Sequence, residues 1–352
     1  DEYEEGKADL FSVFMLLAID RLLPNGKYGM INMQSWMFLS SFEKLRTRLL
    51  TENRIDNMLH LGPRTFDELS GEVVQNTAFV ITNCEGKDAT GAYYRLVDGK
   101  NCGEKNRMFL EAQENDGNRI YYPNVSQQDF EKIPGCPIGY WVSEKVISIF
   151  SKYPNMTQKV NATQGLATAN NNRFTRFWFE VTWTKVGLNF ESVKDTLRSE
   201  KKWFPYNKGG NQRRWYGNQE FIVNWENDGY EIRNFKDENG KVRSRPQNTQ
   251  YYFNPSISWS DISSSSNSFK IYPKGFIFDV CGMSCFEVPN RINLLGVLNT
   301  KFYAFLSHIL NPTMHFVASD FNSIPLVYTN QKYVTFIANN NISISKSLCK
   351  SN

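Results

Sequence analysis

The sequence has no long hydrophobic run and little excess charge of either sign. No apolar stretch among its 352 residues approaches the ~18 residues that a membrane-spanning helix needs. The formal net charge is only +4, so a surface that binds nucleic acid must be a local patch. No secretory signal is visible, and we expect a cytoplasmic protein with no membrane partner.

Cysteine and histidine are too few and too scattered to suggest a metal site. The six cysteines form no CxxC pair, and the three histidines lie far from them in the sequence. A structural zinc site usually draws its ligands from such residues at short spacings. We therefore expect no bound metal, and we expect reduced thiols of the kind found in the cytoplasm.

One stretch combines positive charge, aromatic rings and glycine. Between Lys194 and Gln219 there are seven Lys or Arg against two Asp or Glu. Five large aromatic residues are interleaved with them: Trp203, Phe204, Tyr206, Trp215 and Tyr216. Cations neutralise phosphates, rings stack on bases, and paired glycines let backbone N–H groups approach an anion. Composition does not decide between such a contact surface and a solvated loop whose aromatics lie in a core.

The first half of the chain alternates between helix and strand patterns. Apolar periodicity predicts helices at 9–23 and 42–51, and strands at 27–33, 55–61 and 73–83. The first helix has apolar residues on almost every face, so we expect it to be largely buried. This order, with short connections, fits one half of a doubly wound sheet. Residues 100–118 read as polar and rich in turns, and a helix is predicted at 140–152.

The second half is richer in strand patterns. Candidate strands lie at 177–183, 221–224, 257–259 and 274–280, and the polar segment 234–250 is expected to be exposed. A long amphipathic helix is predicted at 291–310. The polar tail from residue 339 is expected to be loose.

Several runs resemble one enzyme family. The first half contains GKADLFSVFMLLAIDRLLPNGKYGMINMQSWMF, FEKLRTRLLTENRIDNMLHLG and VVQNTAFVITN. Together they resemble the second half of the catalytic domain of adenine-N6 DNA methyltransferases of the γ arrangement. The runs GLATANNNRFTRFW and KWFPYNKGGNQRRWYGN resemble the target-recognition region of the PglX methyltransferases of BREX phage-defence systems and of related type II restriction-modification methyltransferases.

The resemblance implies a fold of class α/β plus α+β. It consists of the C-terminal half of a Rossmann-like methyltransferase sheet, then a strand-rich target-recognition domain with a long helix. Residues 1–90 would belong to the catalytic domain and residues 155–352 to the domain that recognises DNA. Residues 91–154 would connect the two. The implied partners are double-stranded DNA and other restriction or phage-defence subunits. The implied cofactor is S-adenosyl-L-methionine, bound only by the full-length protein.

The sequence departs from that family in two respects. It contains neither Asn-Pro-Pro-Tyr nor Asp-Pro-Pro-Tyr, and no Gly-rich cofactor loop precedes Asp9. In the resembled family those elements hold the target amine and the cofactor. We therefore expect a fragment of a longer methyltransferase that is inactive alone and has no catalytic residue of its own.

Three residues of the first half acquire roles from the resemblance. An aromatic at the position of Phe66 would stack on the adenine swung out of the duplex, which loses its neighbours in the helix. Leu10 and Phe14 would flank the adenine of the cofactor. For each of these side chains, plain packing in the core is the alternative.

Ten residues are the candidates for DNA contact. They are Thr168, Asn170, Asn172, Arg173, Lys208, Gly209, Gly210, Arg213, Arg214 and Asn218. Arginine and asparagine can pair with base edges, whereas lysine on a phosphate gives affinity without sequence choice.

Two other functions fit the same residues. The chain could be a stand-alone DNA-binding specificity module, since residues 294–326 also resemble type I restriction specificity subunits. A binding protein for carbohydrate or peptide is the third hypothesis, although basic residues beside the aromatics disfavour a neutral sugar. Steep weakening of binding by salt would favour DNA.

Overall fold

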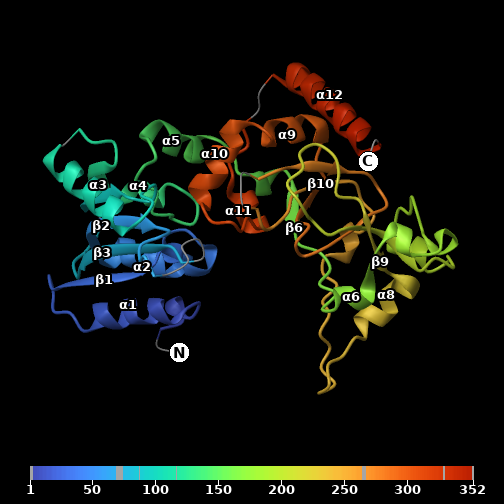
Figure 1. The fold of residues 1–352 in the computed structure, drawn as a ribbon, viewed down its shortest axis with the longest axis horizontal. Coiled ribbons are helices and arrows are strands. Elements are labelled where there is room, and N and C mark those ends of the chain that lie inside the picture. Colours follow the sequence, from blue (N-terminus) through green and yellow to red (C-terminus); the bar gives the residue numbers. More distant parts are fainter. Residues whose placement is uncertain are drawn as a thin grey trace. The chain divides into compact units, whose positions relative to one another are not determined.

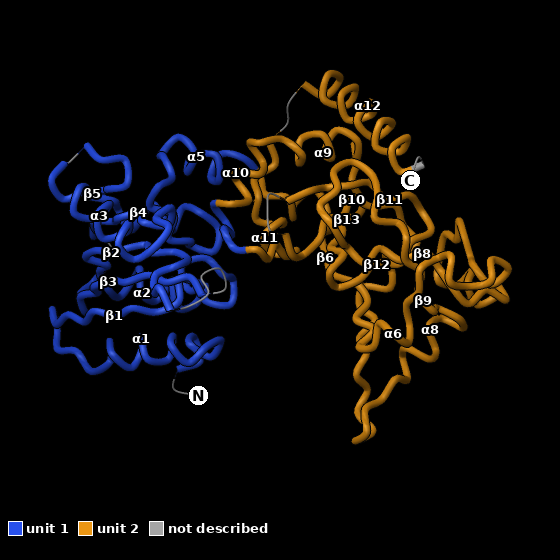
Figure 2. The backbone as a smooth tube through the Cα atoms, in the orientation of Figure 1, with its two compact units in different colours: residues 1–153, 309–313 blue, residues 154–308, 314–352 orange. Residues whose placement is uncertain are grey.

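The chain forms two compact units. The computed structural model describes residues 3–68, 74–86, 88–115, 117–263, 267–327 and 330–350. Unit 1 comprises residues 1–153 and 309–313, and unit 2 comprises 154–308 and 314–352 (Figure 2). Within the described part of the chain, no helix is both long and apolar enough to cross a bilayer.

Unit 1 is built on a five-stranded sheet in the order β1-β3-β2-β4-β5. The strands are β1 (Lys27–Met33), β2 (Arg54–Gly62), β3 (Asn76–Thr82), β4 (Thr90–Arg95) and β5 (Tyr121–Ser126). The helices are α1 (Leu10–Asp20), α2 (Glu43–Glu52), α3 (Cys102–Glu114), α4 (Gln128–Glu131) and α5 (Glu144–Lys152).

The order of the first three strands requires a crossover. β3 pairs antiparallel with both β1 and β2, so those two strands run parallel to each other on either side of it. The connection from β1 to β2 contains α2, as a connection between parallel strands requires. β2 then pairs in parallel with β4, and β4 pairs antiparallel with β5.

Alternation along the strands separates the two faces of this sheet. Tyr93 is fully buried in a cluster that also holds Met15 of α1 and Leu49 of α2. Neighbouring strand residues point to opposite faces, and the next residue, Tyr94, contacts Phe109 of α3 with ring centroids 5.0 Å apart. One face therefore carries the main core, and α3 covers the other.

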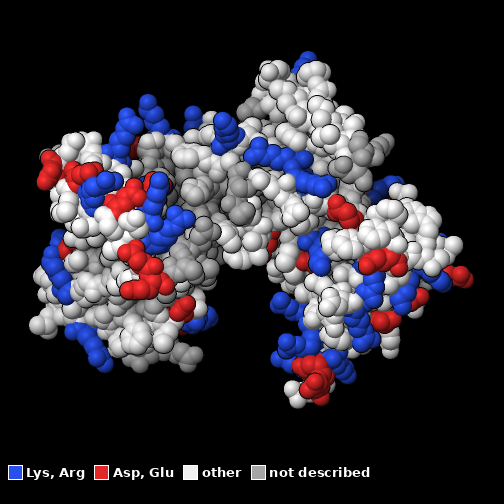
Figure 3. All heavy atoms as spheres, viewed as in Figure 1, with Lys and Arg blue, Asp and Glu red and all other residues white. Residues whose placement is uncertain are grey.

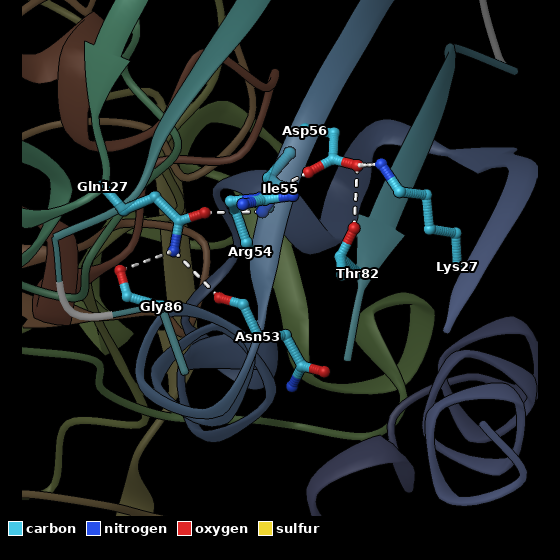
Figure 4. Close-up of polar contacts among 8 residues, drawn as sticks. All are labelled: Lys27, Asn53, Arg54, Ile55, Asp56, Thr82, Gly86 and Gln127. Atoms are coloured by element: carbon cyan, nitrogen blue, oxygen red, sulfur yellow. Dashed lines mark hydrogen bonds and ion pairs between the residues drawn. The ribbon is translucent and has the colours of Figure 1, made fainter. Parts of the chain in front are cut away.

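Two polar side chains tie the strands of unit 1 to their neighbours (Figure 4). Asp56 of β2 accepts from Lys27 Nζ of β1 at 2.6 Å and from Thr82 Oγ1 of β3 at 2.8 Å. The buried Gln127 accepts from the N–H of Ile55 at 2.5 Å and donates to the carbonyl of Asn53 at 3.0 Å. These bonds fix the start of β2 from both sides.

Unit 2 contains two four-stranded sheets. One has the order β11-β10-β13-β6 and the other the order β12-β8-β9-β7. The strands of the first are β6 (Asn161–Thr163), β10 (Ser256–Ser258), β11 (Lys270–Tyr272) and β13 (Ser284–Phe286). Those of the second are β7 (Thr175–Phe177), β8 (Trp203–Asn207), β9 (Phe221–Asn224) and β12 (Ile277–Phe278). Segment 234–250 contains no α-helix or strand, leads into a 3-10 helix at Thr249–Tyr251, and is largely exposed, as predicted.

Helices of 4 to 20 residues lie around these sheets (Figure 1). They are α6 (Asn171–Phe174), α7 (Val193–Thr196), α8 (Glu226–Arg233), α9 (Arg291–Leu298), α10 (Lys301–Leu310), α11 (Ala318–Ser323) and α12 (Gln331–Lys350). The last two residues of α10 are grouped with unit 1. α9 and α12 pack side by side, and Gly296 lies directly under Val334.

Five sequence-based expectations about elements are wrong, one of which, the strand predicted at 177–183, ends at Phe177. The predicted helix at 291–310 is two helices, because Asn299 leaves the helical path and bonds through its amide to both backbone groups of Phe269. The tail from 339 is not loose but lies in α12. Segment 100–118 contains the helix α3. α1 is buried along one side only, since Leu10 and Phe14 are exposed.

Candidate nucleic-acid interface

The basic and aromatic stretch forms the loop between two paired strands. β8 ends at Asn207 and β9 begins at Phe221, and Tyr206 pairs with Phe221. Residues 208–220, the β8–β9 loop, therefore project from one end of this hairpin. The loop contains six of the ten candidate DNA contacts: Lys208, Gly209, Gly210, Arg213, Arg214 and Asn218.

A buried asparagine anchors the start of the β8–β9 loop. Asn207 Nδ2 donates to Ser258 Oγ of β10 at 2.7 Å and to Ser284 Oγ of β13 at 3.2 Å. Its Oδ1 accepts from the N–H of Gly209 at 3.2 Å. One side chain thus joins the loop to both sheets of unit 2.

Glycine is required at the next turn. Gly209 has a φ of 75°, a region that residues with a Cβ rarely occupy. A Cβ there would also lie 2.8 Å from the carbonyl oxygen of Cys281. The sequence signal of paired glycines therefore has a local structural cause, and Gly210 beside it is exposed.

A buried carboxylate supports the loop from behind. Asp279 accepts from the hydroxyl of Tyr206 and, at 2.7 Å, from the N–H of Cys281. Burial raises the pKa of the Asp279 carboxyl above its ordinary value, and these two donors oppose the shift. The N–H of Asp279 also donates to the carbonyl of Asn207 at 2.9 Å, so the support reaches the first turn of the loop.

Two of the candidate contacts are buried and bond to other residues of the chain. Asn218 is buried, and its Nδ2 donates to the carbonyl of Asn211 at 2.8 Å, which closes the β8–β9 loop on itself. Thr168 is also buried, and its hydroxyl donates to Asn171 Oδ1 at 2.7 Å. Both side chains shape a surface rather than present themselves on it.

The cations of the loop reach solvent to different degrees. Lys208 is half-buried, with Nζ 4.8 Å from the centre of the Phe221 ring. Arg213 and Arg214 are exposed, and Arg213 Nη1 lies 3.9 Å from Glu220 Oε1. On the face drawn in Figure 3, Lys and Arg of unit 2 are interspersed with Asp and Glu.

The remaining candidates lie at the other end of the same strands. Asn170 caps α6 by accepting from the N–H of Arg173 at 3.0 Å. Arg173 itself is exposed and lies 3.8 Å from Glu231 of α8. α6 leads into β7, in which Thr175 pairs with Val223 near the end of β9. The structure thus places the Asn170–Arg173 group and the β8–β9 loop at opposite ends of β9.

Four exposed aromatic residues were missed by the sequence analysis. Phe177, Trp178, Phe179 and Trp183 all reach solvent, although their pattern predicted a strand at 177–183. The strand ends at Phe177, and Trp178–Glu180 form a 3-10 turn. The N–H of Trp178 donates to the carbonyl of Glu220 at 3.0 Å, which places these rings beside the end of the β8–β9 loop. The signal was four large rings within seven residues, flanked by Arg176 and Lys185.

Phe66 lies on the surface of unit 1, just after β2. Its side chain is 41% exposed, so the alternative of core packing does not apply. Gly62 turns the chain with a φ of 67° and accepts from Thr65 Oγ1 at 3.0 Å. Lys105 of α3 fixes the end of β2, because its buried amine donates to the carbonyl of Leu61 at 2.6 Å. Residues 69–73 lie outside the described part.

Leu10 and Phe14 share one face of α1. They are four residues apart, a spacing that places side chains above one another on a helix, and both are exposed. Core packing is therefore excluded for them as well. They form a small apolar surface, of the kind that a flat ring can contact.

A buried lysine lies beneath the β8–β9 loop. Lys270 of β11 is fully buried, and its Nζ has no hydrogen-bond partner among the described residues. Burial lowers its pKa to about 8, with nearby Arg213 acting in the same direction and Glu220 opposing it. Lys270 and Tyr272 share a face of β11, and the hydroxyl of Tyr272 donates to the carbonyl of Asn218 in the loop at 2.7 Å.

Replacing Lys270 with methionine is expected to stabilise unit 2 at neutral pH. A pKa of about 8 in the fold, below the unfolded value of ~10.4, means that the unfolded chain binds more protons between the two values. The free energy of unfolding of the wild type therefore rises with pH in that window. Below about pH 8 the buried amine is charged, and the full cost of burying that charge lowers the stability of the fold. Urea unfolding should favour the variant by ~2–3 kcal/mol at pH 7, and the difference should shrink above pH 8.

The exposed Lys274 supplies the control for this substitution. It pairs with Glu191 on the surface, so Lys274→Met should change the free energy of unfolding by less than ~1 kcal/mol. A Lys270→Met protein that is less stable than wild type at pH 7 would contradict the expectation.

Comparison with known proteins identifies relatives for the whole chain. Residues 1–66 match the model of the Eco57I restriction-modification methylase family. The sequence is 39% identical over 349 residues to the adenine-specific methyltransferase PglX of Lacticaseibacillus casei (strain Zhang), covering 98% of this chain and 29% of PglX. The chain is a relative of the PglX adenine-specific methyltransferases. It is also 36% identical over 352 residues to BrxX of Escherichia coli O9:H4 (strain HS), covering 98% of this chain and 27% of BrxX.

The chain thus spans less than a third of the length of PglX and BrxX. Among solved structures it is similar to the Type IIL restriction-modification enzyme MmeI, determined in complex with DNA. The TM-score is 0.59 at 12% identity, covering 97% of this chain and 45% of MmeI. That likeness shows a shared mixed α/β fold, and the relation to PglX confirms the family predicted from the sequence.

Proposed function

We propose that this chain is the C-terminal part of a site-specific adenine-N6 DNA methyltransferase. It would supply the end of the catalytic sheet and the region that recognises the target sequence in double-stranded DNA. The observation that carries this proposal is the 39% identity with PglX, which extends over 98% of the chain and so includes both units.

The sheet of unit 1 supports the catalytic half of the proposal. β1 and β2 are parallel with the antiparallel β3 inserted between them, which suits the end of a Rossmann-like methyltransferase sheet. We propose that residues 1–90 belong to the catalytic domain and that residues 155–352 recognise DNA. Residues 91–154 would connect these two parts. A stand-alone specificity module would have no use for this sheet.

The residues of this chain do not suffice to hold S-adenosyl-L-methionine. Leu10 and Phe14 could contact an adenine ring, but the sequence lacks the Gly-rich loop and the Asn/Asp-Pro-Pro-Tyr motif. We therefore derive no step of methyl transfer for these residues and propose that the chain is inactive alone. In the complete enzyme, Phe66 would stack on the extruded adenine.

The β8–β9 loop is the proposed centre of DNA contact. Its exposed Arg213 and Arg214 can meet phosphates or guanine edges, and the half-buried Lys208 can meet a phosphate. Asn170, Asn172 and Arg173 would form a second group of contacts. Gly209, Gly210, Thr168 and Asn218 would act by setting the backbone that carries these side chains.

Replacing Lys208, Arg213 and Arg214 together with alanine tests this placement. If each cation neutralises one phosphate, the slope of log affinity against log salt should fall by roughly 2.7 in magnitude. Raising the salt from 50 to 200 mM should therefore weaken wild-type binding by roughly 40-fold more than it weakens binding of the variant. Fluorescence anisotropy with a labelled duplex, titrated over a series of salt concentrations, measures both quantities.

The matched control carries three alanines on unit 1, at Lys44, Arg48 and Lys132. These cations are remote from the β8–β9 loop in the chain, and Arg48 and Lys132 already pair with carboxylates. The control should keep nearly the wild-type slope. Equal losses in both triple variants would refute the placement, and a flat salt response of the wild type would refute DNA binding itself.

A further inference from the structure

Unit 2 contains a cavity of about 740 Å³ beside the β8–β9 loop. Its walls come from three segments: the turn after β7, the end of the loop, and the last turns of α12. Its lining includes the side chains of Trp178, Phe179, Arg213, Tyr216, Gln219 and Lys346. The volume lies in the ~300–1,000 Å³ range of sites for small organic ligands.

One wall of the cavity is aromatic. Trp178 and Phe179 meet edge to face, with centroids 5.7 Å apart and planes at 85°. Both rings are substantially exposed, Phe179 at 65%. The bond from the N–H of Trp178 to the carbonyl of Glu220 holds them at the cavity. A flat ligand can stack on one ring while its edge meets the other.

The charges around the cavity favour an anionic ligand. Arg213 lines it, and Lys346 of α12 lies 5.2 Å from the centre of the Tyr216 ring. Lys270 lies beneath the same loop and is close enough to Arg213 for the two charges to interact. Glu220 also lines the cavity, and its carboxylate partly offsets these positive charges.

A polar group of the cavity lacks its partner. Gln219 Oε1 accepts from the hydroxyl of Tyr216 at 2.9 Å. Its Nε2 is buried and has no hydrogen-bond partner among the described residues. A buried donor without an acceptor costs free energy that a ligand with an acceptor on its edge would recover.

We propose that this cavity binds a single DNA nucleotide that has left the base stack. The base would lie on Trp178 or Phe179 and accept a hydrogen bond from Gln219 Nε2, and its phosphate would face Arg213 and Lys346. A paired base cannot occupy the site, because its neighbours already cover both of its faces. The cavity is built from unit 2 alone, so this nucleotide is distinct from the adenine assigned to Phe66. The inference rests on the proposed function.

The test compares two duplexes that differ by one unpaired nucleotide. One is fully paired, and the other carries a single bulged 2-aminopurine, whose fluorescence reports stacking. Wild-type protein is expected to bind the bulged duplex about tenfold more tightly, which corresponds to ~1.4 kcal/mol, and to change the probe fluorescence. Trp178→Ala with Phe179→Ala should abolish the preference and leave affinity for the paired duplex within about twofold.

Phe336→Ala is the matched control, since Phe336 of α12 is also a phenylalanine and is 64% exposed, but it does not line the cavity. It should keep the preference, whereas Gln219→Leu should reduce it. Equal wild-type affinity for both duplexes would overturn the inference and leave the proposed function standing. Absence of salt-dependent binding to either duplex would overturn both. Tighter binding of free dAMP than of the bulged duplex would assign the cavity to a free nucleotide and also overturn it.

Discussion

Replacing Arg46 with alanine is expected to lower the free energy of unfolding of unit 1 by roughly 3–5 kcal/mol. Arg46 of α2 is 1% exposed, and the hydrogen-bond acceptors of its guanidinium include three backbone carbonyls. Its guanidinium donates to the carbonyls of Trp36 at 2.8 Å, Leu39 at 2.7 Å and Gly135 at 2.6 Å. Truncation removes the donor of three carbonyls and leaves a cavity between α2 and the segment around residue 135.

Arg48 provides the control for this change. It lies two residues further along α2, and its side chain, which is 23% exposed, pairs with Asp20 and Glu52. Its replacement with alanine should cost about 1 kcal/mol or less, as for ion pairs in contact with solvent. Hydrogen exchange of peptides from β1, β2 and β3 reports unit 1 specifically. Similar protection in the two variants would show that the Arg46 network contributes little.

Replacing Asn207 with alanine is expected to have the largest effect on unit 2. The substitution removes the partner of Ser258, Ser284 and the N–H of Gly209, all at buried positions. Loss of several buried hydrogen bonds should lower the free energy of unfolding by roughly 2–4 kcal/mol. Since Asn207 also anchors the β8–β9 loop, exchange of amides 208–218 should accelerate, and duplex affinity should fall about tenfold.

Two comparisons separate these effects of Asn207. Asn254→Ala removes an exposed amide of the same unit and should change neither stability nor affinity. The proposed contacts Arg213 and Arg214 remain in the Asn207 variant, so its salt slope should stay close to that of wild type although its affinity falls. A slope reduced as in the triple cation variant would mean that Asn207 does not act by positioning the loop.

Local patterns predicted the sheet of unit 1 because each element carries its own signal. The expected strands at 27–33 and 55–61 differ from β1 and β2 by at most one residue at each end. The third predicted strand, 73–83, contains β3, although Val73 lies outside the described residues. α3 was missed because its sequence is polar and contains Gly103, and its start depends on Asn101, which caps it.

Elements that depend on distant residues were not predictable from the sequence. The helix pattern at 291–310 is continuous, but Asn299 bonds to Phe269, thirty residues away, and interrupts it. α12 is rich in Asn and Ser, and it forms where Val334 and Ala338 meet Gly296 of α9. The hydrophobic periodicity of the local sequence gives no sign of either contact.

The candidate site was predicted in composition but not in geometry. The basic and aromatic stretch and its paired glycines pointed to the β8–β9 loop. Asn218 and Thr168 are buried, whereas Trp178 and Phe179 are exposed. These positions depend on contacts between segments distant in the sequence, which no short stretch of sequence encodes. The apolar residues at 177–183 look like a buried strand until the chain turns after Phe177.

The two groups of candidate contacts lie at opposite ends of β9, a strand of four residues. Its ends are about 10 Å apart at ~3.3 Å per residue, and successive nucleotides of one DNA strand are spaced by ~3.4 Å. If the axis of the DNA duplex ran along β9, the two groups would contact base pairs about three positions apart. Each group would then recognise a different part of the target sequence, and changing the residues of one group would leave the sequence preference of the other intact.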